Sequence, residues 1–584
     1  MNNSMTLRIT ILLACLLLWP AAPLWAQQTA VAVQKAQPEV LLFMSGHGSQ
    51  AKADLLLSLA KDEPFTLTNM KTKGKSDEEI ARAWSEADLV LLDGINPELS
   101  KFMFGKYQSY LTEFAQVPVI SLGDKDNAVM NQGISEQDKN MIAAYYKHAG
   151  RFNYQNMMAY LSRDVFKRST KAAKPPFPVP DVGLYHYGFP GLLTSDESAF
   201  FDYLAPKSDQ AVIAVAIHRS VIDYEQQQVV DTLIKGLEEK GAKAFAFFFE
   251  GNDELLPYTD LLMTQQQSGQ AAVSRVNLVI NYRSLHYVEK RRQEFAKLGV
   301  PVIHALNYTE GDEEKFLADN AGISPSLTPF FLVMPEDTGS VDPSIIAATE
   351  QGRKVVMASQ MQALIERAYN HARLVHIPNQ EKKVAAFIWN YPPGEKNIGA
   401  AFLDVPASLG QISAAMKAQG YRVQDKKAEY FIKAAGQLLR PYYRHEDTSS
   451  LIGLRLADYL PLKTYLAWFN QLPQEVRNPI VERWGKPEES AMLTTAARNK
   501  GEGQGQEIQE PAFIIPRMDL GNMIVMPQGV RGEDAKEHAN LYHSSKTPIN
   551  HSYLAIYLYA RQVFGADGSV VFGWVFAAHQ LGAA

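Results

Sequence analysis

The sequence predicts an α/β protein built from several doubly wound, mostly parallel-sheet modules of the flavodoxin or Rossmann kind in one multidomain chain. Unbroken apolar runs recur along its 584 residues, for example at 40–44, 89–92 and 212–217. Such runs are typical of strands buried on both faces. Segments with helical character separate them, an alternation that favours parallel strands joined by crossover helices. The length gives a soft expectation of about four domains.

The composition excludes some classes of function. Hydrophobic residues make up 46% and charged residues 21%, ordinary values for a globular protein. The net charge is −6 with no basic block, so nothing indicates a nucleic-acid partner. The sequence contains no Walker A motif, no Gly-x-Ser-x-Gly and no His-Glu-x-x-His. We therefore expect no ATP hydrolysis by this chain alone and no zinc-protease chemistry.

Residues 1–26 have the layout of a secretory signal peptide. Arg8 precedes an apolar run at 9–18, and Ala26 closes an acceptable cleavage site. We therefore expect an exported, periplasmic protein. The alternative is a membrane anchor formed by an uncleaved N-terminal segment, although the run is short against the roughly 20 residues of a span. Cys15 is the only cysteine, so the mature chain would have no disulfide or thiolate metal site. No span is expected in the mature chain.

Residues 27–173 form the first expected module, with strands at 40–44, 89–92 and 117–123 and a helix at 51–59. The loop 45–49 follows the first strand and contains His47 between two glycines. Backbone amides there could approach an anion at the carboxyl end of the sheet. The alternative is a tight strand-to-helix turn with no ligand.

A Pro-rich and irregular connection is expected at 174–210, including an irregular segment at 181–201. The second module covers 211–376, with strands at 212–217, 244–249, 278–281, 300–303 and 355–357, helices at 225–240 and 361–374, and a Pro/Ser-rich connection at 320–338. His218 and His304 follow strands here, as His47 does in the first module. Imidazoles at strand ends could ligate a metal or meet an acidic ligand. They could equally be three independent polar residues.

Residues 377–505 form the third expected module, with a helical part. A strand at 383–389 leads into the loop 390–399, where two prolines stiffen the turn and Gly394 and Gly399 relax it. Asp404 is placed to cap the next helix and Pro406 to lie in its first turn. The loop is either ligand-facing or shaped only for packing.

Residues 506–584 form the last segment. A short strand with a Gly-rich exit covers 521–532, and its Arg531 could bind a carboxylate in bidentate fashion. His543 and His551 follow, and histidine is the commonest ligand for borderline metals. The two lie eight residues apart with Pro548 between them, so they share no helix. A helix is expected at 554–564.

These segments, taken in order, resemble one known family. The sequence of 385–394, the Ile-Gly of 398–399 and the Leu-Asp-Val-Pro-Ala-Ser-Leu of 403–409 are similar to a segment of CobN and magnesium-chelatase large (H) subunits. So are 521–532, 542–543 and 551–555, with 481–485 between them. The similarity extends from about residue 40 to about residue 572.

The resemblance implies a large subunit that holds a tetrapyrrole, either a corrin or a porphyrin, while a divalent metal such as cobalt or magnesium is inserted. The metal is a substrate, no cofactor motif is recognisable, and ATP is used only by partner subunits, one of them an AAA+ ATPase. On this interpretation Asn390, Tyr391, Gly394, Gly399, Gln528 and Arg531 bind the substrate, and His543 and His551 are the catalytic and metal-ligating candidates.

Two departures from the family pattern shape the functional expectation. After the strand near 570 the family carries a His-x-Gly-x-His-Gly motif, which the residues 573–582 do not match. The expectation is therefore an aberrant or truncated chelatase core, so enzymatic activity stays open. The signal peptide is the second departure. It favours an alternative: an exported tetrapyrrole- or metal-binding protein, or a dechelatase-type haem-handling protein without ATP-driven chelation.

Overall fold

The computed structural model describes residues 37–44, 50–72, 74–94, 105–122, 131–249, 256–264, 272–390, 394–400, 403–444, 450–490, 493–494, 510–532, 537, 540–541, 544 and 546–572. The chain divides into two compact units, Met1–Val179 and Pro180–Ala584. The division falls within the Pro-rich stretch that the sequence placed between modules. In the part of the chain that the structure describes, no helix is both long and apolar enough to cross a membrane.

The first unit contains a four-stranded parallel sheet in the order β2-β1-β3-β4. Its strands are β1 (Glu39–Met44), β2 (Thr66–Met70), β3 (Leu89–Asp93) and β4 (Val119–Leu122). Its helices are α2 (Gln50–Ala60), α3 (Asp77–Glu86), α5 (Tyr110–Glu113), α6 (Glu136–His148) and α7 (Gly150–Tyr160). A capping box fixes the start of α3, because the Ser76 side chain accepts the Glu79 N–H and the Glu79 carboxylate accepts the Ser76 N–H.

A charged group is buried at the carboxyl edge of this sheet. The Asp93 carboxylate, at the end of β3, accepts from Lys52 Nζ and from the Tyr146 hydroxyl, each at 2.8 Å. All three side chains are less than a tenth exposed. The Lys52 ammonium also lies 4.0 Å from the centroid of the Tyr146 ring. Opposite charges and a hydrogen bond therefore offset the desolvation of Asp93. The loop 45–49 lies outside the described residues.

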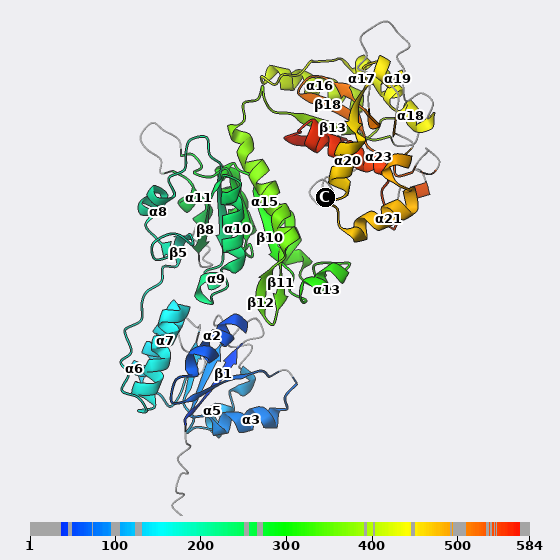
Figure 1. Ribbon diagram of the computed structural model, residues 1–584. Coiled ribbons are helices and arrows are strands. Elements are labelled where there is room, and N and C mark those ends of the chain that lie inside the picture. The colour runs from blue at the N-terminus through cyan, green and yellow to red at the C-terminus, as the bar shows by residue number, and fades with distance from the viewer. Residues whose placement is uncertain are drawn as a thin grey trace, which may run out of the picture. The chain divides into compact units, whose positions relative to one another are not determined.

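The second unit begins with an eight-stranded sheet in the order β12-β11-β10-β9-β7-β8-β5-β6 (Figure 1). Five neighbouring strands of this sheet, β11, β10, β9, β7 and β8, are parallel to one another. Strands β5, β6 and β12 are each paired in antiparallel fashion. The strands are β5 (Val182–Tyr185), β6 (Leu193–Thr194), β7 (Val212–Ile217), β8 (Lys243–Phe249), β9 (Leu278–Tyr282), β10 (Val302–Asn307), β11 (Ser340–Glu350) and β12 (Arg353–Val356).

Helices cover both faces of this sheet, which makes it doubly wound. They are α8 (Glu197–Leu204), α9 (Ser220–Asp223), α10 (Gln228–Glu239), α11 (Pro257–Leu262), α12 (Val288–Leu298), α13 (Glu313–Ala318), α14 (Met334–Thr338) and α15 (Ala358–Arg373). Along β7, Ile213 and Val215 pack in a core with α10 and α15, whereas Ala214 and Ala216 pack in the opposite core with α11 and α12. The apolar run is therefore unbroken because both faces are buried.

Two segments that the sequence predicted to be irregular contain regular structure. Residues 181–201 include β5 and β6, and β5 pairs with β8. Gly183 lets β5 lie close to β8, because a Cβ at this position would be 2.7 Å from the Phe248 ring. Residues 320–338 include a π-helical turn at Pro329–Val333 and then α14. Each of these two short segments has a proline in its first turn, where the missing N–H has no intrahelical partner.

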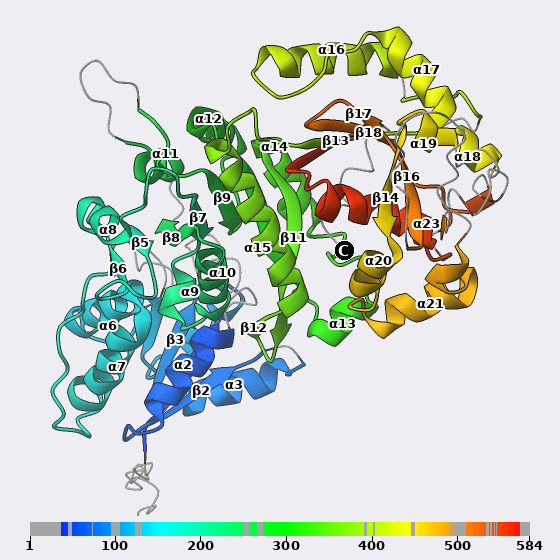
Figure 2. The same ribbon diagram turned by 45° about the horizontal axis from the view of Figure 1, so that its top comes forward.

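The C-terminal part of the second unit contains a four-stranded sheet in the order β17-β18-β13-β19 and a three-stranded antiparallel sheet in the order β14-β16-β15 (Figure 2). Strands β18 and β19 are both parallel to β13. Strand pairing thus joins the expected segments 377–505 and 506–584 in one sheet. The strands are β13 (Val384–Ile388), β14 (Ala457–Pro461), β15 (Leu493–Thr494), β16 (Ala512–Pro516), β17 (Met518–Asp519), β18 (Met523–Pro527) and β19 (Gly568–Phe572).

Helices enclose the four-stranded sheet as well. They are α16 (Val405–Ala418), α17 (Ala428–Leu438), α18 (Arg440–Tyr443), α19 (Ser450–Gly453), α20 (Leu462–Phe469), α21 (Gln474–Trp484) and α23 (His551–Leu558). Ala385 and Phe387 of β13 pack with α20, α21 and α23, and the alternate residues Ala386 and Ile388 pack with α16 and α17. The predicted cap of α16 is confirmed, since Asp404 Oδ1 accepts the Ala407 N–H at 3.0 Å.

Candidate functional site

The sheet geometry brings two predicted loops to one edge. Strands β13 and β18 are parallel neighbours, and Ile388 lies opposite Pro527 at their carboxyl ends. The Gln528 N–H donates to the Ile388 carbonyl at 2.9 Å, one residue beyond the end of β18. Asn390 and Gln528 therefore follow the ends of neighbouring strands at the same edge of the sheet. In open α/β sheets, ligands bind at this edge.

Asn390 uses its side chain to shape its own loop. Its Nδ2 donates to the carbonyls of Gly394 at 2.7 Å and Asn397 at 2.6 Å. Its Oδ1 accepts from the Tyr443 hydroxyl, which in turn accepts the Gly394 N–H. The Gly399 N–H donates to the Trp389 carbonyl at 3.1 Å. These bonds make Asn390 a buried organiser of the loop. Tyr391 lies outside the described residues.

The second loop is held close to helix α23. A Cβ on Gly529 would lie 2.8 Å from the Tyr553 Cα, so only glycine fits this approach. The side chain of Asn550 donates from Nδ2 to the carbonyls of Val530 at 3.0 Å and Gly532 at 2.9 Å. Arg531 donates from Nη1 to the Ser544 carbonyl at 2.7 Å. A backbone acceptor therefore holds one nitrogen of the guanidinium that the sequence assigned to a substrate carboxylate.

Two tyrosines of α23 lie beside Gln528, and sequence reasoning did not assign them to the site. Gln528 Nε2 donates to the Tyr553 hydroxyl at 3.4 Å, and the Tyr557 hydroxyl donates to the same oxygen at 3.4 Å. The Tyr557 ring stacks on Phe387 of β13 with centroids 5.0 Å apart. Burial raises the pKa of Tyr557, so its hydroxyl remains protonated at neutral pH. The spacing of four residues on a helix is the signal that could have grouped the pair.

His551 is a buried histidine whose ring nitrogens both contact protein groups. Nε2 lies 3.0 Å from the Gly485 carbonyl, and Nδ1 lies 2.8 Å from the Tyr465 hydroxyl. A carbonyl only accepts, so Nε2 carries the proton and Nδ1 accepts from Tyr465. Burial lowers the pKa of His551, which favours this neutral form. A metal would have to displace one of these two contacts, and the metal-ligand role of His551 stays a prediction.

His543, the partner proposed for His551, lies outside the described residues. Within the residues given above, no group of three or more His, Cys, Asp or Glu side chains is arranged to hold a metal ion. The groups that the described part of the site contains are the Asn390 side chain, the Gln528 amide and the rings and hydroxyls of Tyr553 and Tyr557. Such groups suit an organic ligand better than a bare cation.

Comparison with known proteins identifies relatives of this chain. Residues 143–574, well over half of the chain, match the sequence model of one family, described as CobN/Magnesium Chelatase. The chain belongs to the CobN/magnesium chelatase family. The matched range contains both loops of the site and all three sheets of the second unit.

Individual relatives agree with this membership. An uncharacterised protein of Methanocaldococcus jannaschii is 25% identical over a match that covers 87% of this chain and 42% of that protein. A magnesium-chelatase H subunit, from Rhodobacter capsulatus, is 23% identical, with coverage of 89% and 40%. The chain thus spans about two fifths of the length of these relatives.

A solved structure shares the fold. The catalytic subunit of cobaltochelatase from Mycobacterium tuberculosis superposes with a TM-score of 0.64 and 19% sequence identity, covering 91% of this chain and 42% of that chain. The predicted α/β architecture of several parallel-dominated sheets is therefore confirmed for this CobN-family chain.

The strand-end histidines of this CobN-family chain do not form one cluster among the described residues. His218 follows β7 and is exposed, and its Nδ1 lies 2.8 Å from the Ser220 hydroxyl. His304 lies within β10, 1% exposed, and its Nδ1 accepts from Asn281 Nδ2 at 3.0 Å. His304 therefore has a core position and was wrongly placed at the strand end. His47 lies outside the described residues.

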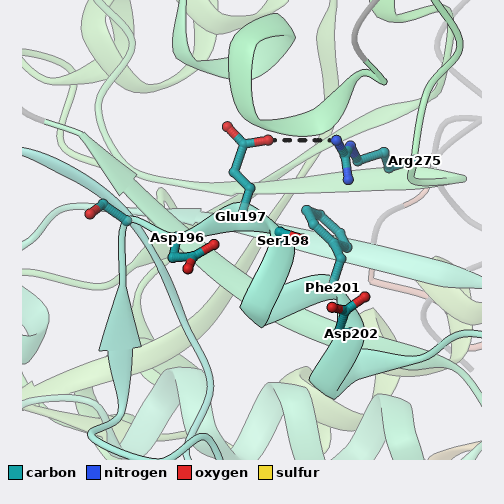
Figure 3. Close-up of a pocket in the computed structure, with 7 residues that line it drawn as sticks. Asp196, Glu197, Ser198, Phe201, Asp202 and Arg275 are labelled. Atoms are coloured by element: carbon teal, nitrogen blue, oxygen red, sulfur yellow. Dashed lines mark ion pairs between the residues drawn. The ribbon is translucent and has the colours of Figure 1, made fainter.

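A separate hollow of about 410 Å³ lies beside helix α8. Figure 3 shows Glu197 pointing toward Arg275, with which it forms an ion pair at 3.6 Å. Asp196 caps α8 by accepting the Ala199 N–H at 3.1 Å, and Asp202 also lines the hollow. Three carboxylates against one guanidinium would repel an acidic ligand, and the roles of Asp196 and Glu197 are accounted for by capping and ion pairing.

Proposed function

We propose that this chain is the tetrapyrrole-binding part of a cobaltochelatase-like metal chelatase. In this proposal it holds a corrin or porphyrin ring while cobalt, magnesium or another divalent metal is inserted, and separate subunits, one an AAA+ ATPase, use the ATP. The observation that carries the proposal is the family match over residues 143–574, which includes the site at the ends of β13 and β18. The absence of a Walker A motif from the sequence agrees with ATP use by partners.

The described residues suggest how the ring would be held. The Asn390 side chain and Tyr443 hold the described residues Gly394 and Asn397 in place, so these contacts exist before a ligand arrives. The Gln528 amide and the Tyr553 and Tyr557 hydroxyls supply neutral hydrogen-bonding groups at the same edge. Preorganised polar groups lose little conformational entropy on binding. In this proposal Gln528 orients the ligand, and Arg531 and Gly529 maintain the shape of the loop.

The N-terminal segment favours a second candidate function. Residues 1–26 have the composition of a signal peptide, which points to a protein that acts after export. An exported member of this family would bind an imported tetrapyrrole or its metal, or remove the metal, without ATP-driven chelation. Fractionation followed by N-terminal sequencing distinguishes the two: a chain cleaved near Gln27 in the periplasm supports export, and an intact chain in the cytoplasm contradicts it.

Titration of the purified protein with porphyrins and corrins tests the shared part of both proposals. We expect saturable quenching of ring fluorescence by the wild-type protein. Gln528→Ala should bind the ring about tenfold more weakly, because one half-buried hydrogen-bonding partner is lost. Gln471→Ala is the matched control, because Gln471 is exposed and bonds only within its own helix region. If no tetrapyrrole binds at micromolar concentration, both proposals fail.

A metal-insertion assay distinguishes a chelatase from an exported protein that only binds the tetrapyrrole, which we call the carrier. The wild-type protein is mixed with a tetrapyrrole, a divalent metal, ATP and the companion subunits of a family member, and the absorption spectrum is followed. Metal insertion that needs ATP supports the chelatase. Saturable binding with no spectral change under these conditions supports the carrier, and loss of a bound metal without ATP supports the dechelatase-type function.

A further inference from the structure

The turn that follows β5 is built around a buried histidine. His186 comes directly after β5 and is 4% exposed. The Gly188 N–H donates to its Nδ1 at 3.0 Å, and the Tyr203 hydroxyl of α8 lies 3.1 Å from the same nitrogen. A nitrogen that accepts carries no proton, so the proton is on Nε2, which donates to Glu238 Oε1 of α10 at 3.2 Å. The turn described here therefore requires a neutral ring.

Two carboxylates on α10 favour the charged form of the same ring. Glu238 contacts His186 and also accepts from the Tyr187 hydroxyl at 2.6 Å. Asp231 lies seven residues earlier on the same face of the helix and accepts from the Tyr185 hydroxyl at 2.8 Å. Burial raises the pKa of Asp231, and the charge of a protonated His186 is among the smaller effects that lower it. A positive ring would therefore be attracted by both carboxylates.

The other titratable groups around the ring change this balance little. Lys235 lies on the same face of α10, and its ammonium is 4.8 Å from the Tyr187 ring centroid. Lys235 is exposed, so solvent screens its charge more than the charges of the half-buried carboxylates. The hydrogen bond to Glu238, followed by burial, raises the pKa of Tyr187 to about 12, and burial raises the pKa of Tyr185 and of Tyr203. These three hydroxyls therefore stay neutral near pH 7.

The turn itself is held in a strained conformation. Leu192 has a φ of +69° and is 42% exposed, a conformation that is unfavourable for a residue with a Cβ. Backbone bonds close the turn, from the His186 N–H to the Leu192 carbonyl at 3.1 Å and from the Phe189 N–H to the His186 carbonyl at 3.0 Å. A Cβ on Gly188 would lie 2.7 Å from the Tyr203 hydroxyl, so only glycine fits over the ring. Loss of one bond can therefore release stored strain.

The two demands on the imidazole conflict, and this makes the turn bistable. A proton added to Nδ1 would face the Gly188 N–H, so that hydrogen bond is lost while the ring gains an ion pair with Glu238. Histidine is the side chain that ordinarily changes charge between pH 5 and 8. We propose that His186 is a pH-sensitive switch that opens the turn 187–192 when its ring is protonated. The switch lies in the eight-stranded sheet, and it does not depend on the proposed function.

Hydrogen exchange of the full chain between pH 8 and pH 5 tests the switch. The readout is the protection factor of the peptide 186–192, corrected for the intrinsic effect of pH on amide exchange. His186→Asn keeps a side-chain acceptor for the Gly188 N–H but cannot be protonated. Glu238→Gln keeps the shape and an acceptor oxygen but removes the charge. Glu239→Gln is the matched control, because it removes the same charge from the neighbouring, exposed position of α10. Thermal melting at pH 8 shows that each variant is folded.

We expect the wild-type peptide to lose about tenfold in protection from pH 8 to pH 5, as for the loss of one hydrogen bond. Glu239→Gln should behave like the wild type. Glu238→Gln should lose protection only at a lower pH, because the charge that stabilises the imidazolium is gone, and His186→Asn should keep its protection throughout. Constant protection in the wild type, or an equal loss in His186→Asn, overturns the switch. If His186→Asn does not fold, opening at the same pH in Glu238→Gln and the wild type overturns it.

Discussion

Single residues in this protein show how burial determines the chemistry open to an imidazole. His551 comes from a sequence motif that suggested a metal ligand, yet its two nitrogens contact the Gly485 carbonyl and the Tyr465 hydroxyl. The Phe469 ring packs edge-on against it, with centroids 5.1 Å apart. The histidine therefore links α23 to the end of α21 and to α20, and its expected role is structural.

Replacing His551 by Ala should lower the free energy of unfolding by about 2–4 kcal/mol, because the change leaves a cavity and two unpaired polar groups. The response to added metal should be unchanged. Urea unfolding and a metal titration of the same samples measure the two effects. His371→Ala, at an exposed position of α15, is the control and should change neither. A small loss of stability with a large loss of metal response would instead support the metal-ligand assignment.

His304 gives stability a dependence on pH. Burial lowers its pKa from 6.5 to about 4, so between these values the folded state binds fewer protons than the unfolded state. Stability from the neutral ring is therefore present above pH 6.5 and is lost as the pH falls toward 4. The loss should reach about 3 kcal/mol. His304→Asn keeps an acceptor for Asn281 but cannot titrate. As the pH falls from 6.5 to 4, the wild type should lose stability that the variant does not lose, so the difference between their unfolding free energies should shrink. A difference that stays constant with pH would contradict the lowered pKa of His304.

At the scale of elements, α23 is the helix that completes the candidate site. Its first turn is capped by Asn550, whose Oδ1 accepts the Tyr553 N–H at 2.8 Å. The same side chain holds the loop after β18 through its Nδ2, as described above. One residue thus positions both the helix that carries the two tyrosines and the loop that carries Gln528.

Asn550→Ala should lower the free energy of unfolding by about 2–4 kcal/mol, because the cap and two hydrogen bonds to buried carbonyls are lost together. Asn550→Asp keeps the capping oxygen but has no donor for the loop. It should therefore preserve the helix while weakening tetrapyrrole binding. Far-ultraviolet circular dichroism, urea unfolding and ring fluorescence quenching separate the two roles. Equal effects of the two substitutions on all three measurements would show that the loop contacts of Asn550 have no separate effect on tetrapyrrole binding.

Some helices and strands could be predicted from the sequence and others could not. Local signals predicted the cap at Asp404 and the buried runs of β1 and β7, because capping chemistry and hydrophobic continuity lie within a few residues. The strand β5 was missed, since its glycine and aromatic residues make sense only beside Phe248 of β8. For the candidate site, the sequence singled out Asn390 and Gln528, and their substrate-binding role stays a prediction. The contacts of Tyr443 and Tyr557 were not predicted, because they join residues distant in sequence.

At the scale of the whole molecule, the two compact units have separate buried cores. The core of the first unit contains Trp84, which is fully buried and contacts Phe43 with ring centroids 5.4 Å apart. The second unit has its own cores on both faces of its sheets. The sequence indicated the Pro-rich boundary between the units, but pattern alone could not show that strands on both sides of residue 505 share one sheet.

Trp84→Ala should destabilise the first unit by about 3–5 kcal/mol. Because each unit has its own core, we expect calorimetry to show one transition that moves to lower temperature and another that stays in place. Tetrapyrrole binding should persist between the two transitions, since the candidate site lies entirely in the second unit. A single transition that shifts as a whole would show that the two units unfold cooperatively.

The pairing of β13 has a consequence for how this protein is made. Its neighbours β18 and β19 begin at Met523 and Gly568, far along the chain from the end of β13 at Ile388. Pairing between such distant segments is slow, because the intervening chain must be closed into a large loop first. During synthesis β13 therefore has no β18 until residue 527 has been made and no β19 until residue 572 has been made. In that interval the unpaired apolar strand exposes the nascent chain to aggregation, a state that chaperones counter.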